Sequence, residues 1–224
     1  MSDKAQYQAS ETHVGRTSSR EETDQASYWD EIYASSENNS PGWNLGEVNP
    51  EFIWQLQHAQ PKFVPGRVLV LGAGYGHDAA YLAKQGFEVC AVDMSDWAVR
   101  GARQTFEQAG VEVELLHSDI FALDSSYNGR FDYVLEHTCF CAIHPERRSD
   151  YRDLVYRVLK PGGQLFGLFY FHQKEGGPPF NTTPDEVRDA FAKGFRIETL
   201  AMAEHNVEKR RGKELWARFW KEEA

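Results

Sequence analysis

The sequence has few cysteines and no long apolar run, and both absences limit what the chain can be. Its 224 residues include only three cysteines, Cys90, Cys139 and Cys141. Three is an odd number and too few for a disulfide scaffold. No stretch approaches the ~18 consecutive apolar residues that a membrane-spanning helix requires. We therefore expect neither a disulfide-stabilised domain nor a membrane partner.

The chain is also short of positive charge. It carries 24 basic and 34 acidic residues, which gives a formal net charge of -10 at pH 7. This charge repels a phosphate backbone, so we expect no nucleic-acid partner. The one basic cluster, Lys209 to Arg211 with Lys213, is short and is followed by acidic residues. We interpret that cluster as a solvated turn.

The opening residues 1–27 are polar and rich in Ser, Thr, Gln and Glu. They lack the ~7–15 apolar residues at the centre of a secretory signal peptide. A segment of this composition cannot bury enough apolar surface to fold. We therefore expect a disordered leader over 1–27, a single domain over 28–224, and a cytoplasmic protein.

From residue 28 onward, patterns typical of strands and helices alternate. Apolar runs predict strands at 67–74, 87–93, 111–119, 131–143, 164–171, 195–207 and 213–221. Helical spacing predicts helices at 77–86, 96–110, 148–163 and 184–193. This alternation predicts an α/β fold with a doubly wound, mostly parallel sheet of seven strands. No helix separates the last two strands, so we expect one antiparallel strand at the end of the sheet.

The first predicted strand ends in LGAGYGHD (71–78), where Gly72 and Gly74 would let a ligand approach the backbone closely. The spacing G-x-G-x-G differs from the G-x-G-x-x-G of dinucleotide-binding proteins. Asp93 ends the second strand and Asp119 ends the third, and the carboxyl ends of neighbouring parallel strands meet at one edge of a sheet. Each acid taken singly is more often a helix cap or turn residue. Together they predict a nucleoside site.

In that site Asp93 would accept hydrogen bonds from ribose hydroxyls and Asp119 would accept from an exocyclic amine. Met94 on one side and Ile120 with Phe121 on the other would enclose an adenine ring. These features, with VLKPGG (158–163), resemble the class I S-adenosylmethionine-dependent methyltransferases over residues 67–170.

The flanking segments resemble one family within that class. They are YWDEIYASSENNSPGWNLGEVNP (28–50), FCAIHPERR (140–148), FYFHQKEGGPPF (169–180) and RRGKELWARFWK (210–221). They are similar to the thiopurine S-methyltransferase family, and most closely to its thiol and halide methyltransferase branch. The resemblance implies a Rossmann-like fold, S-adenosylmethionine as cofactor, and methyl transfer to a small soft nucleophile such as a thiol, bisulfide, thiocyanate, halide or thiopurine.

The resemblance also implies that residues 28–50 form a lid over the cofactor. With the residues already named, the predicted cofactor site comprises Trp29, Tyr33, Trp43, Gly72, Gly74, Asp93, Met94, Asp119, Ile120 and His137. The predicted substrate pocket comprises Trp43, Phe140, Arg148, Tyr170 and Phe180. Relatives typically have Tyr at the position of His137 and a second Trp at that of Tyr33. The insertion SSENN (35–39) lengthens the lid.

Alternatives remain open for several of these residues. Phe140 and Tyr170 could equally be core residues, and Arg148 could either hold an anion or pair with Glu146 at a helix start. We assign no essential catalytic side chain, because soft anions need no general base; His137 is the best placed if one exists.

Cys139 and Cys141 lie close to His137 in EHTCFCAIHPERR (136–148). Period-two geometry would put the three side chains on one face while the strand persists. Zinc, however, requires four converging ligands. A disulfide across a single residue is strained. We predict buried small residues against the cofactor and no metal.

Three other functions remain possible: a methyltransferase acting on oxygen or nitrogen, a nicotinamide-dependent oxidoreductase, and a non-catalytic protein that senses the cofactor. Against the oxidoreductase stand the glycine spacing and the closing antiparallel strands. The sequence does not indicate an oligomeric state.

Overall fold

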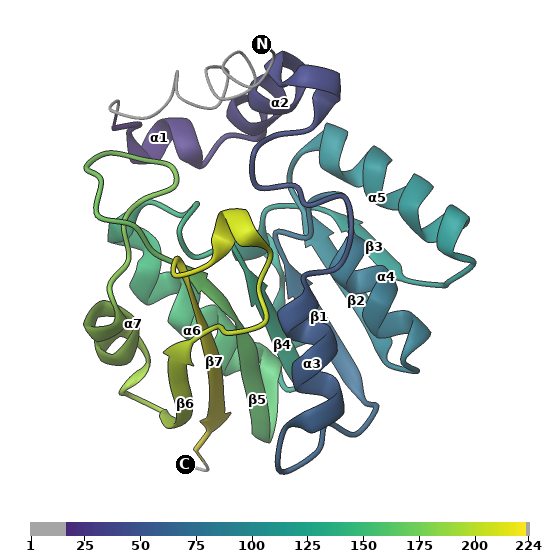
Figure 1. Cartoon of the computed structure of the whole chain (residues 1–224), viewed down its shortest axis with the longest axis vertical. Coiled ribbons are helices and arrows are strands. Elements are labelled where there is room, and N and C mark those ends of the chain that lie inside the picture. Colours follow the sequence, from purple (N-terminus) through teal and green to yellow (C-terminus); the bar gives the residue numbers. More distant parts are fainter. Residues whose placement is uncertain (1–16, 223–224) are drawn as a thin grey trace.

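The computed structural model describes residues 17–222, and its centre is one seven-stranded sheet (Figure 1). The strands are β1 (Arg67–Leu71), β2 (Glu88–Asp93), β3 (Glu114–His117), β4 (Phe131–His137), β5 (Leu159–Tyr170), β6 (Phe195–Met202) and β7 (Glu214–Lys221). Their order is β3-β2-β1-β4-β5-β7-β6. Strand β7 runs antiparallel to the other six strands. The predicted seven-stranded, mostly parallel sheet is confirmed.

We had predicted the antiparallel strand at the end of the sheet, and this position was wrong. The chain crosses over through α7 to the outer edge as β6, and β7 then returns into the position between β5 and β6. A short connection forces the antiparallel direction but does not decide which of the two strands takes the edge.

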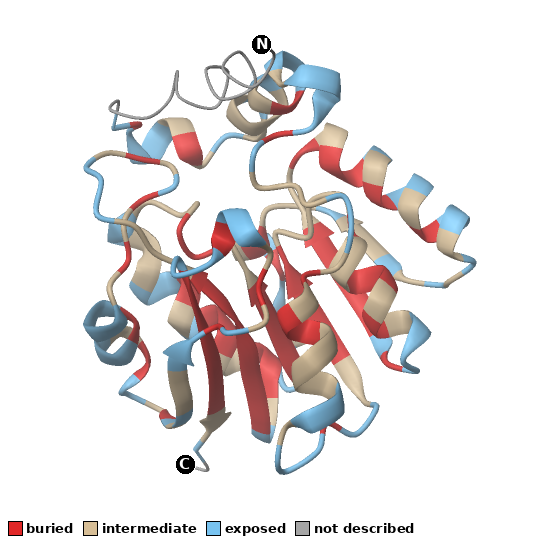
Figure 2. Ribbon diagram, viewed as in Figure 1, coloured by how far each residue is buried: buried red, intermediate tan, exposed pale blue. Residues whose placement is uncertain are grey.

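Helices cover both faces of the sheet (Figure 2). On one face are α3 (Pro50–His58), α4 (His77–Lys84) and α5 (Asp96–Ala109), and on the other are α6 (Arg148–Val158) and α7 (Pro184–Phe191). Two further helices, α1 (Arg20–Thr23) and α2 (Ala26–Ser35), lie over the carboxyl ends of the strands. Short 3-10 helices are η1 (Glu37–Asn39), η2 (Ile120–Ala122), η3 (Ser125–Tyr127), η4 (Pro145–Arg147) and η5 (Glu208–Arg210). In residues 17–222, no helix has the length and apolar character needed to cross a membrane.

The two faces have separate hydrophobic cores because successive residues of a strand point to opposite sides. Val68 and Val70 of β1 pack with residues of α3, α4 and α5. Leu69 and Leu71 of the same strand pack with residues of α6 and α7. This alternation explains why the strand RVLVL is apolar almost throughout.

Several elements differ from the prediction. Strands β3, β4 and β6 are shorter than the predicted runs 111–119, 131–143 and 195–207. Helix α6 ends at Val158 rather than at 163, because Leu159 already pairs with Phe131 and the KPGG segment belongs to β5. Helix α3 was not predicted, although Asn49 caps it and Pro50 opens it. Helix α1 lies inside the segment that we expected to be a disordered leader; residues 1–16 of that segment lie outside the described residues.

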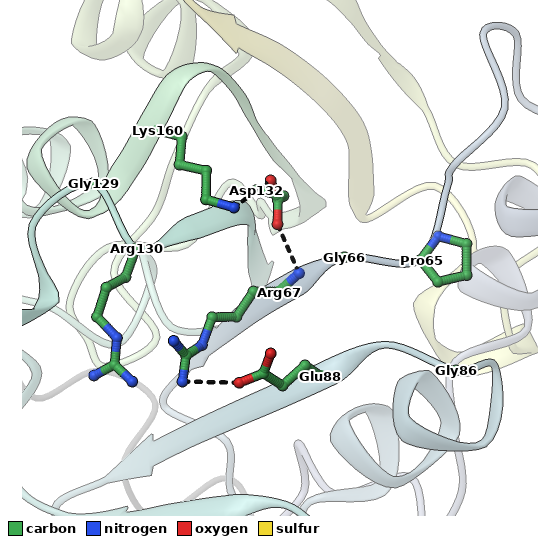
Figure 3. A pocket seen from close by; sticks show the side chains of 9 residues that line it. All are labelled: Pro65, Gly66, Arg67, Gly86, Glu88, Gly129, Arg130, Asp132 and Lys160. Carbon is green, nitrogen blue, oxygen red and sulfur yellow. Dashed lines mark hydrogen bonds and ion pairs between the residues drawn. The ribbon is translucent and has the colours of Figure 1, made fainter.

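A groove of about 480 Å³ lies at the amino ends of β1, β2 and β4, away from the glycine loop (Figure 3). Four of its five charged side chains have partners within the groove, and the fifth, Arg130, lies 3.6 Å from Glu114 beside it. A guanidinium nitrogen of Arg67 lies 2.9 Å from Glu88, and Asp132 accepts from the backbone N–H of Arg67 and from Lys160, each at 2.8 Å. These pairs tie the amino ends of neighbouring strands together.

Candidate active site

The glycine loop after β1 forms a backbone cradle. Gly72 and Gly74 have φ angles of 58° and 54°, in the left-handed region that favours glycine. The Gly74 N–H donates to Asp93 Oδ2 at 2.8 Å, and the Ser95 N–H donates to Asp93 Oδ1 at 2.9 Å. A Cβ at Gly72 would lie 3.0 Å from the Cys139 sulfur, so only a bare backbone fits there. Such a cradle suits a ligand that approaches the main chain.

Asp93 is held at the end of β2 as predicted. Burial raises the pKa of its carboxyl group, and the N–H donors of Ser95 and Gly74 oppose this rise. The same carboxylate therefore fixes the loop and stands at the strand end where ribose hydroxyls are bound in related folds.

Asp119 caps a short helix, which is the more common role of a single acid at a strand end. Its Oδ1 accepts from the Phe121 N–H at 2.9 Å and so caps η2. Ile120 is buried, with 8% of its surface exposed, and belongs to the core cluster on the α6 side. Met94 is half-buried, and its carbonyl accepts from His117 Nε2 at 3.1 Å.

The predicted lid lies across the carboxyl ends of the strands (Figure 1). Trp29 and Tyr33 on α2 meet Trp43 in the following segment, with ring centroids 6.0 Å and 5.6 Å from the Trp43 ring. Trp43 Nε1 donates to the Tyr33 hydroxyl at 3.4 Å. That hydroxyl would be 3.4 Å from a Cβ at Gly74, so the lid reaches the glycine loop.

Polar contacts fasten α2, which belongs to the lid, and α1, which precedes the lid. Asp30 Oδ1 accepts from the Ser95 hydroxyl at 2.6 Å and from the Trp97 N–H at 3.3 Å, which joins α2 to the start of α5. On the other side, Asp24 lies 3.1 Å from a guanidinium nitrogen of Arg147.

The insertion SSENN touches the glycine loop as well. It forms the end of α2 and the 3-10 helix η1, in which Asn38 has a φ angle of 53°. The Tyr75 hydroxyl donates to the carbonyl oxygen of Asn39. Tyr75 stands between Gly74 and Gly76, so the longer lid closes over the loop instead of pointing away from it.

His137, at the end of β4, lies between two carboxylates. Its Nδ1 donates to Asp78 Oδ2 at 2.6 Å, and its Nε2 is 3.8 Å from Glu214 Oε1. Burial lowers the pKa of the imidazole, but the hydrogen bond to Asp78 and the negative charges of Asp78 and Glu214 outweigh burial and raise that pKa to about 10. At neutral pH His137 is therefore an imidazolium, which has no lone pair to accept a proton.

Glu214, at the start of β7, connects His137 to the lid. Its Oε2 accepts from Asn49 Nδ2 at 3.2 Å and from Asn206 Nδ2. Arg210 lies 3.5 Å from Glu214 Oε1 and donates from Nη2 to the Trp43 carbonyl at 3.2 Å. We call Asn49, Asp78, His137, Asn206, Arg210 and Glu214 the polar cluster.

Of the residues in the polar cluster, only His137 was predicted from the sequence. Asp78 lies on α4, Glu214 on β7 and Arg210 in η5, so no spacing rule links them. Glu214 sits in an apolar, aromatic strand, and this was the one available signal that its side chain has a buried partner.

Two of the predicted substrate-pocket residues lie around the polar cluster and the lid. Tyr170 ends β5 opposite Glu214, with the Arg210 guanidinium 4.8 Å from its ring centroid. Trp43 accepts the hydrogen bond of Arg210 at its carbonyl. Phe180 is placed separately: it is buried, its N–H donates to the Cys141 carbonyl at 2.7 Å, and its ring lies 5.3 Å from that of His144.

Two other predicted pocket residues have structural contacts instead. Phe140 is 1% exposed and packs against Tyr151 and Phe169, with centroid distances of 5.4 Å and 5.3 Å, so it belongs to the core. Arg148 Nη2 donates to the Asn181 carbonyl at 2.8 Å and to the Thr182 hydroxyl oxygen at 3.0 Å. Phe140 thus takes the core position that the sequence analysis had left open as an alternative, and Arg148 joins α6 to the segment after β5. The part of these two residues in the substrate pocket stays a prediction.

Cys139 and Cys141 are buried and carry free thiols. Burial raises the pKa of the Cys141 thiol to about 12 and that of Cys139 well above its usual range, so both are neutral. Cys139 lies against Gly72, where a small side chain was predicted. Within residues 17–222, no group of three or more His, Cys, Asp or Glu side chains is arranged to hold a metal ion.

Comparison with known proteins gives a consistent result. The family model described as thiopurine S-methyltransferase matches residues 24–224. A thiopurine S-methyltransferase of Pseudomonas aeruginosa (strain UCBPP-PA14) is 31% identical over 191 residues, 79% of this chain and 86% of the relative. Thiocyanate methyltransferase 1 of Brassica oleracea is 29% identical over 183 residues, 80% of this chain and 79% of the relative.

A solved structure also shares the fold. It is the Burkholderia thailandensis 1,6-didemethyltoxoflavin-N1-methyltransferase with bound S-adenosylhomocysteine, with a TM-score of 0.59, 23% identity, and coverage of 71% of this chain and 72% of that one. Sheet order, glycine cradle and strand-end acid define a class I methyltransferase whose cofactor is S-adenosylmethionine. Within that class, the chain belongs to the thiopurine S-methyltransferase family.

Proposed function

We propose that this enzyme methylates small acceptors that are already nucleophilic, namely thiols, bisulfide, thiocyanate, halides or thiopurines. The family match and the names of the relatives support this class of acceptor. We propose that Trp29, Tyr33, Trp43, Gly72, Gly74, Asp93, Met94, Asp119, Ile120 and His137 surround the cofactor. Trp43, Tyr170 and Phe180 are proposed for the acceptor side.

One observation carries the proposal on the acceptor. The titratable side chain best placed to serve as a base is His137, and it is an imidazolium held between Asp78 and Glu214. An alcohol or protonated amine needs a base to become nucleophilic, whereas a soft anion or thiolate does not. The arrangement therefore favours soft acceptors over oxygen and nitrogen acceptors.

In the proposed mechanism the chain's own residues bind, orient and exclude water. The cofactor supplies an activated methyl group on its sulfonium. The cradle at Gly72 and Gly74 and the carboxylate of Asp93 would hold the nucleoside end of the cofactor. The aromatic lid of Trp29, Tyr33 and Trp43 would exclude water from the acceptor. Holding acceptor and methyl group in line can contribute ~7–11 kcal/mol of the barrier.

The test is formation of S-adenosylhomocysteine with iodide, thiocyanate, bisulfide, a small thiol and a thiopurine. Cofactor binding is recorded by calorimetry in the same samples. Turnover with at least one member of the panel is expected, and the ranking measures the size of the acceptor pocket. Cofactor binding with no turnover on the whole panel would refute the proposed acceptor class and leave the fold and cofactor intact.

We further propose a cytoplasmic location and a small-molecule substrate without a nucleic-acid partner. The free thiols of all three cysteines are consistent with a reducing compartment. The excess of acidic residues weakens association with a phosphate backbone.

A further inference from the structure

Glu136 is a fully buried carboxylate that the proposed mechanism does not use. It precedes His137 on β4 and has 0% of its surface exposed. Its Oε1 accepts from the Phe140 N–H at 2.9 Å, and its Oε2 accepts from the Tyr151 hydroxyl of α6. Burying a carboxylate at this depth is costly, so a role for the charge is worth seeking.

The hydrogen bonds of Glu136 close the turn that borders the glycine cradle. Strand β4 ends at His137, and Thr138 then adopts a φ angle of 61°, which is rare for a β-branched residue. This turn brings the Cys139 sulfur to 3.0 Å from a Cβ position on Gly72. The Glu136 carboxylate therefore lies within one short turn of the backbone that faces the cofactor.

Negative charge converges on this turn. Glu136, Asp93 and Asp119 all act electrostatically on the Cys139 thiol and, together with burial, raise its pKa. The cations around this turn have partners of their own. His137 donates its Nδ1 hydrogen bond to Asp78, and Arg210 lies 3.5 Å from Glu214. Arg148 donates to the Asn181 carbonyl and the Thr182 hydroxyl oxygen. Glu136 therefore places a negative charge beside the cradle in a region that excludes water, where a charge acts most strongly.

We propose that Glu136 makes the site prefer its cationic cofactor, S-adenosylmethionine, over the uncharged product, S-adenosylhomocysteine, by holding a buried negative charge beside the cradle. The two molecules differ by a methyl group and by the sulfonium charge, which is lost when the methyl group leaves. A fixed anion attracts the first and is indifferent to the second. This preference also helps product leave after each turnover. Glu136 is a positioning residue that acts at a distance and touches no reacting atom.

The test compares the affinities of the two molecules for three proteins, measured by calorimetry: the wild type, Glu136→Gln and Tyr151→Phe. Glu136→Gln keeps the shape and removes the charge. Tyr151→Phe removes one of the hydrogen bonds that lower the pKa of Glu136, so the three proteins are compared at about pH 9, where Glu136 keeps its charge without this bond. We expect Glu136→Gln to lower the affinity for S-adenosylmethionine about tenfold more than the affinity for S-adenosylhomocysteine. This is the size of effect expected from removing one charge at an intermediate dielectric constant. Tyr151→Phe should change both affinities by the same factor. Equal losses in Glu136→Gln, no loss, or a selective loss in Tyr151→Phe would each overturn the proposal.

A second measurement uses the wild type alone, in case Glu136→Gln does not fold. Burial raises the pKa of Glu136 to about 7, against its bonds from Tyr151 and Phe140. A nearby cation lowers this pKa, so binding of S-adenosylmethionine at neutral pH should release a fraction of a proton that S-adenosylhomocysteine does not release. Calorimetry in two buffers of different ionisation enthalpy measures this difference. Equal proton release for both ligands would overturn the proposal.

Other titratable groups face Glu136 and must be considered in the proton count. They are Tyr151 on α6, Cys139 and Cys141 in the turn, His137 on β4, and Asp93 beyond Cys139. The phenol and both thiols are neutral at pH 7 and His137 is charged, so none of the four titrates there. Asp93 is present when either ligand binds, so its contribution to proton release is reduced when the proton release measured for S-adenosylhomocysteine is subtracted from that measured for S-adenosylmethionine. Failure of both ligands to bind would refute the cofactor assignment itself, which is a different outcome from equal binding.

Discussion

His137 donates a hydrogen bond of 2.6 Å to Asp78, a residue 59 positions earlier in the chain. The contact joins the end of β4 to the first turn of α4, directly after the glycine loop. With Glu214 on its other side, His137 is charged in the folded protein over most of the pH range. Its charge is therefore a contribution to stability that depends on pH.

Stability should fall as the pH rises from about 6.5 to about 10. The folded-state pKa of His137, about 10, is higher than the 6.5 of a free imidazole. A raised pKa gives a stabilisation that is complete below the unfolded-state pKa and is lost as the pH rises through the folded-state pKa. The loss is on the order of 5 kcal/mol. Urea unfolding of the wild type across this range measures it, with His137→Gln as the control. Parallel curves for the two proteins would contradict the assignment of charge.

Gly72→Ala should weaken cofactor binding. Alanine at Gly72 must adopt a φ angle of 58°, and its Cβ would lie 3.0 Å from the Cys139 sulfur, so the glycine loop or the turn at Cys139 must shift. Gly110→Ala is the matched control, because Gly110 has a φ angle of 65° and open space where the Cβ would be. Both substitutions carry a similar backbone cost of ~1–2 kcal/mol. Only Gly72→Ala should lower cofactor affinity by more than tenfold; equal affinities in the two variants would exclude the cradle as the binding surface.

The sequence predicted the parts of the site that lie within one local motif. Gly72, Gly74 and Asp93 are linked by a strand, a tight turn and a neighbouring parallel strand, and these follow from periodicity and glycine spacing. Likewise, Trp29, Tyr33 and Trp43 were placed together through resemblance, and the structure brings their rings into contact.

The sequence failed where the backbone leaves a regular element. Period-two alternation would have put His137 and Cys139 on one face, but β4 ends at His137 and Thr138 turns with a positive φ angle. His137 consequently faces Asp78, while Cys139 and Phe140 enter the core on the α6 side. A one-residue turn of this kind leaves no periodic signal, so the sequence could not decide between the pocket and the core for Phe140.

Removing the lid contact of Asp30 should lower cofactor affinity more than it lowers the stability of the fold. Asp30→Ala deletes the acceptor for the Ser95 hydroxyl and the Trp97 N–H, which hold α2 against α5. Charge-assisted bonds of this kind contribute ~1.5–3 kcal/mol, so we expect cofactor affinity to fall about tenfold. Asp96→Ala is the control, because Asp96 is exposed and pairs with Arg100 on the surface of α5. Fluorescence titration measures both, and matching affinities would show that Asp30 does not hold the lid closed.

Arg148 should affect stability without selecting for anions. Its Nη2 is occupied by the Asn181 carbonyl and the Thr182 hydroxyl, and its Cζ lies 4.9 Å from the centroid of the Phe140 ring. We expect Arg148→Ala to lower the free energy of unfolding by ~2–3 kcal/mol and to reduce kcat/KM for thiocyanate and for a neutral thiol by the same factor. Arg148→Lys should lose nearly as much, since an ammonium cannot reproduce the planar fork. A loss confined to thiocyanate, and restored in Arg148→Lys, would instead give this side chain the anion-holding role that the sequence had left open.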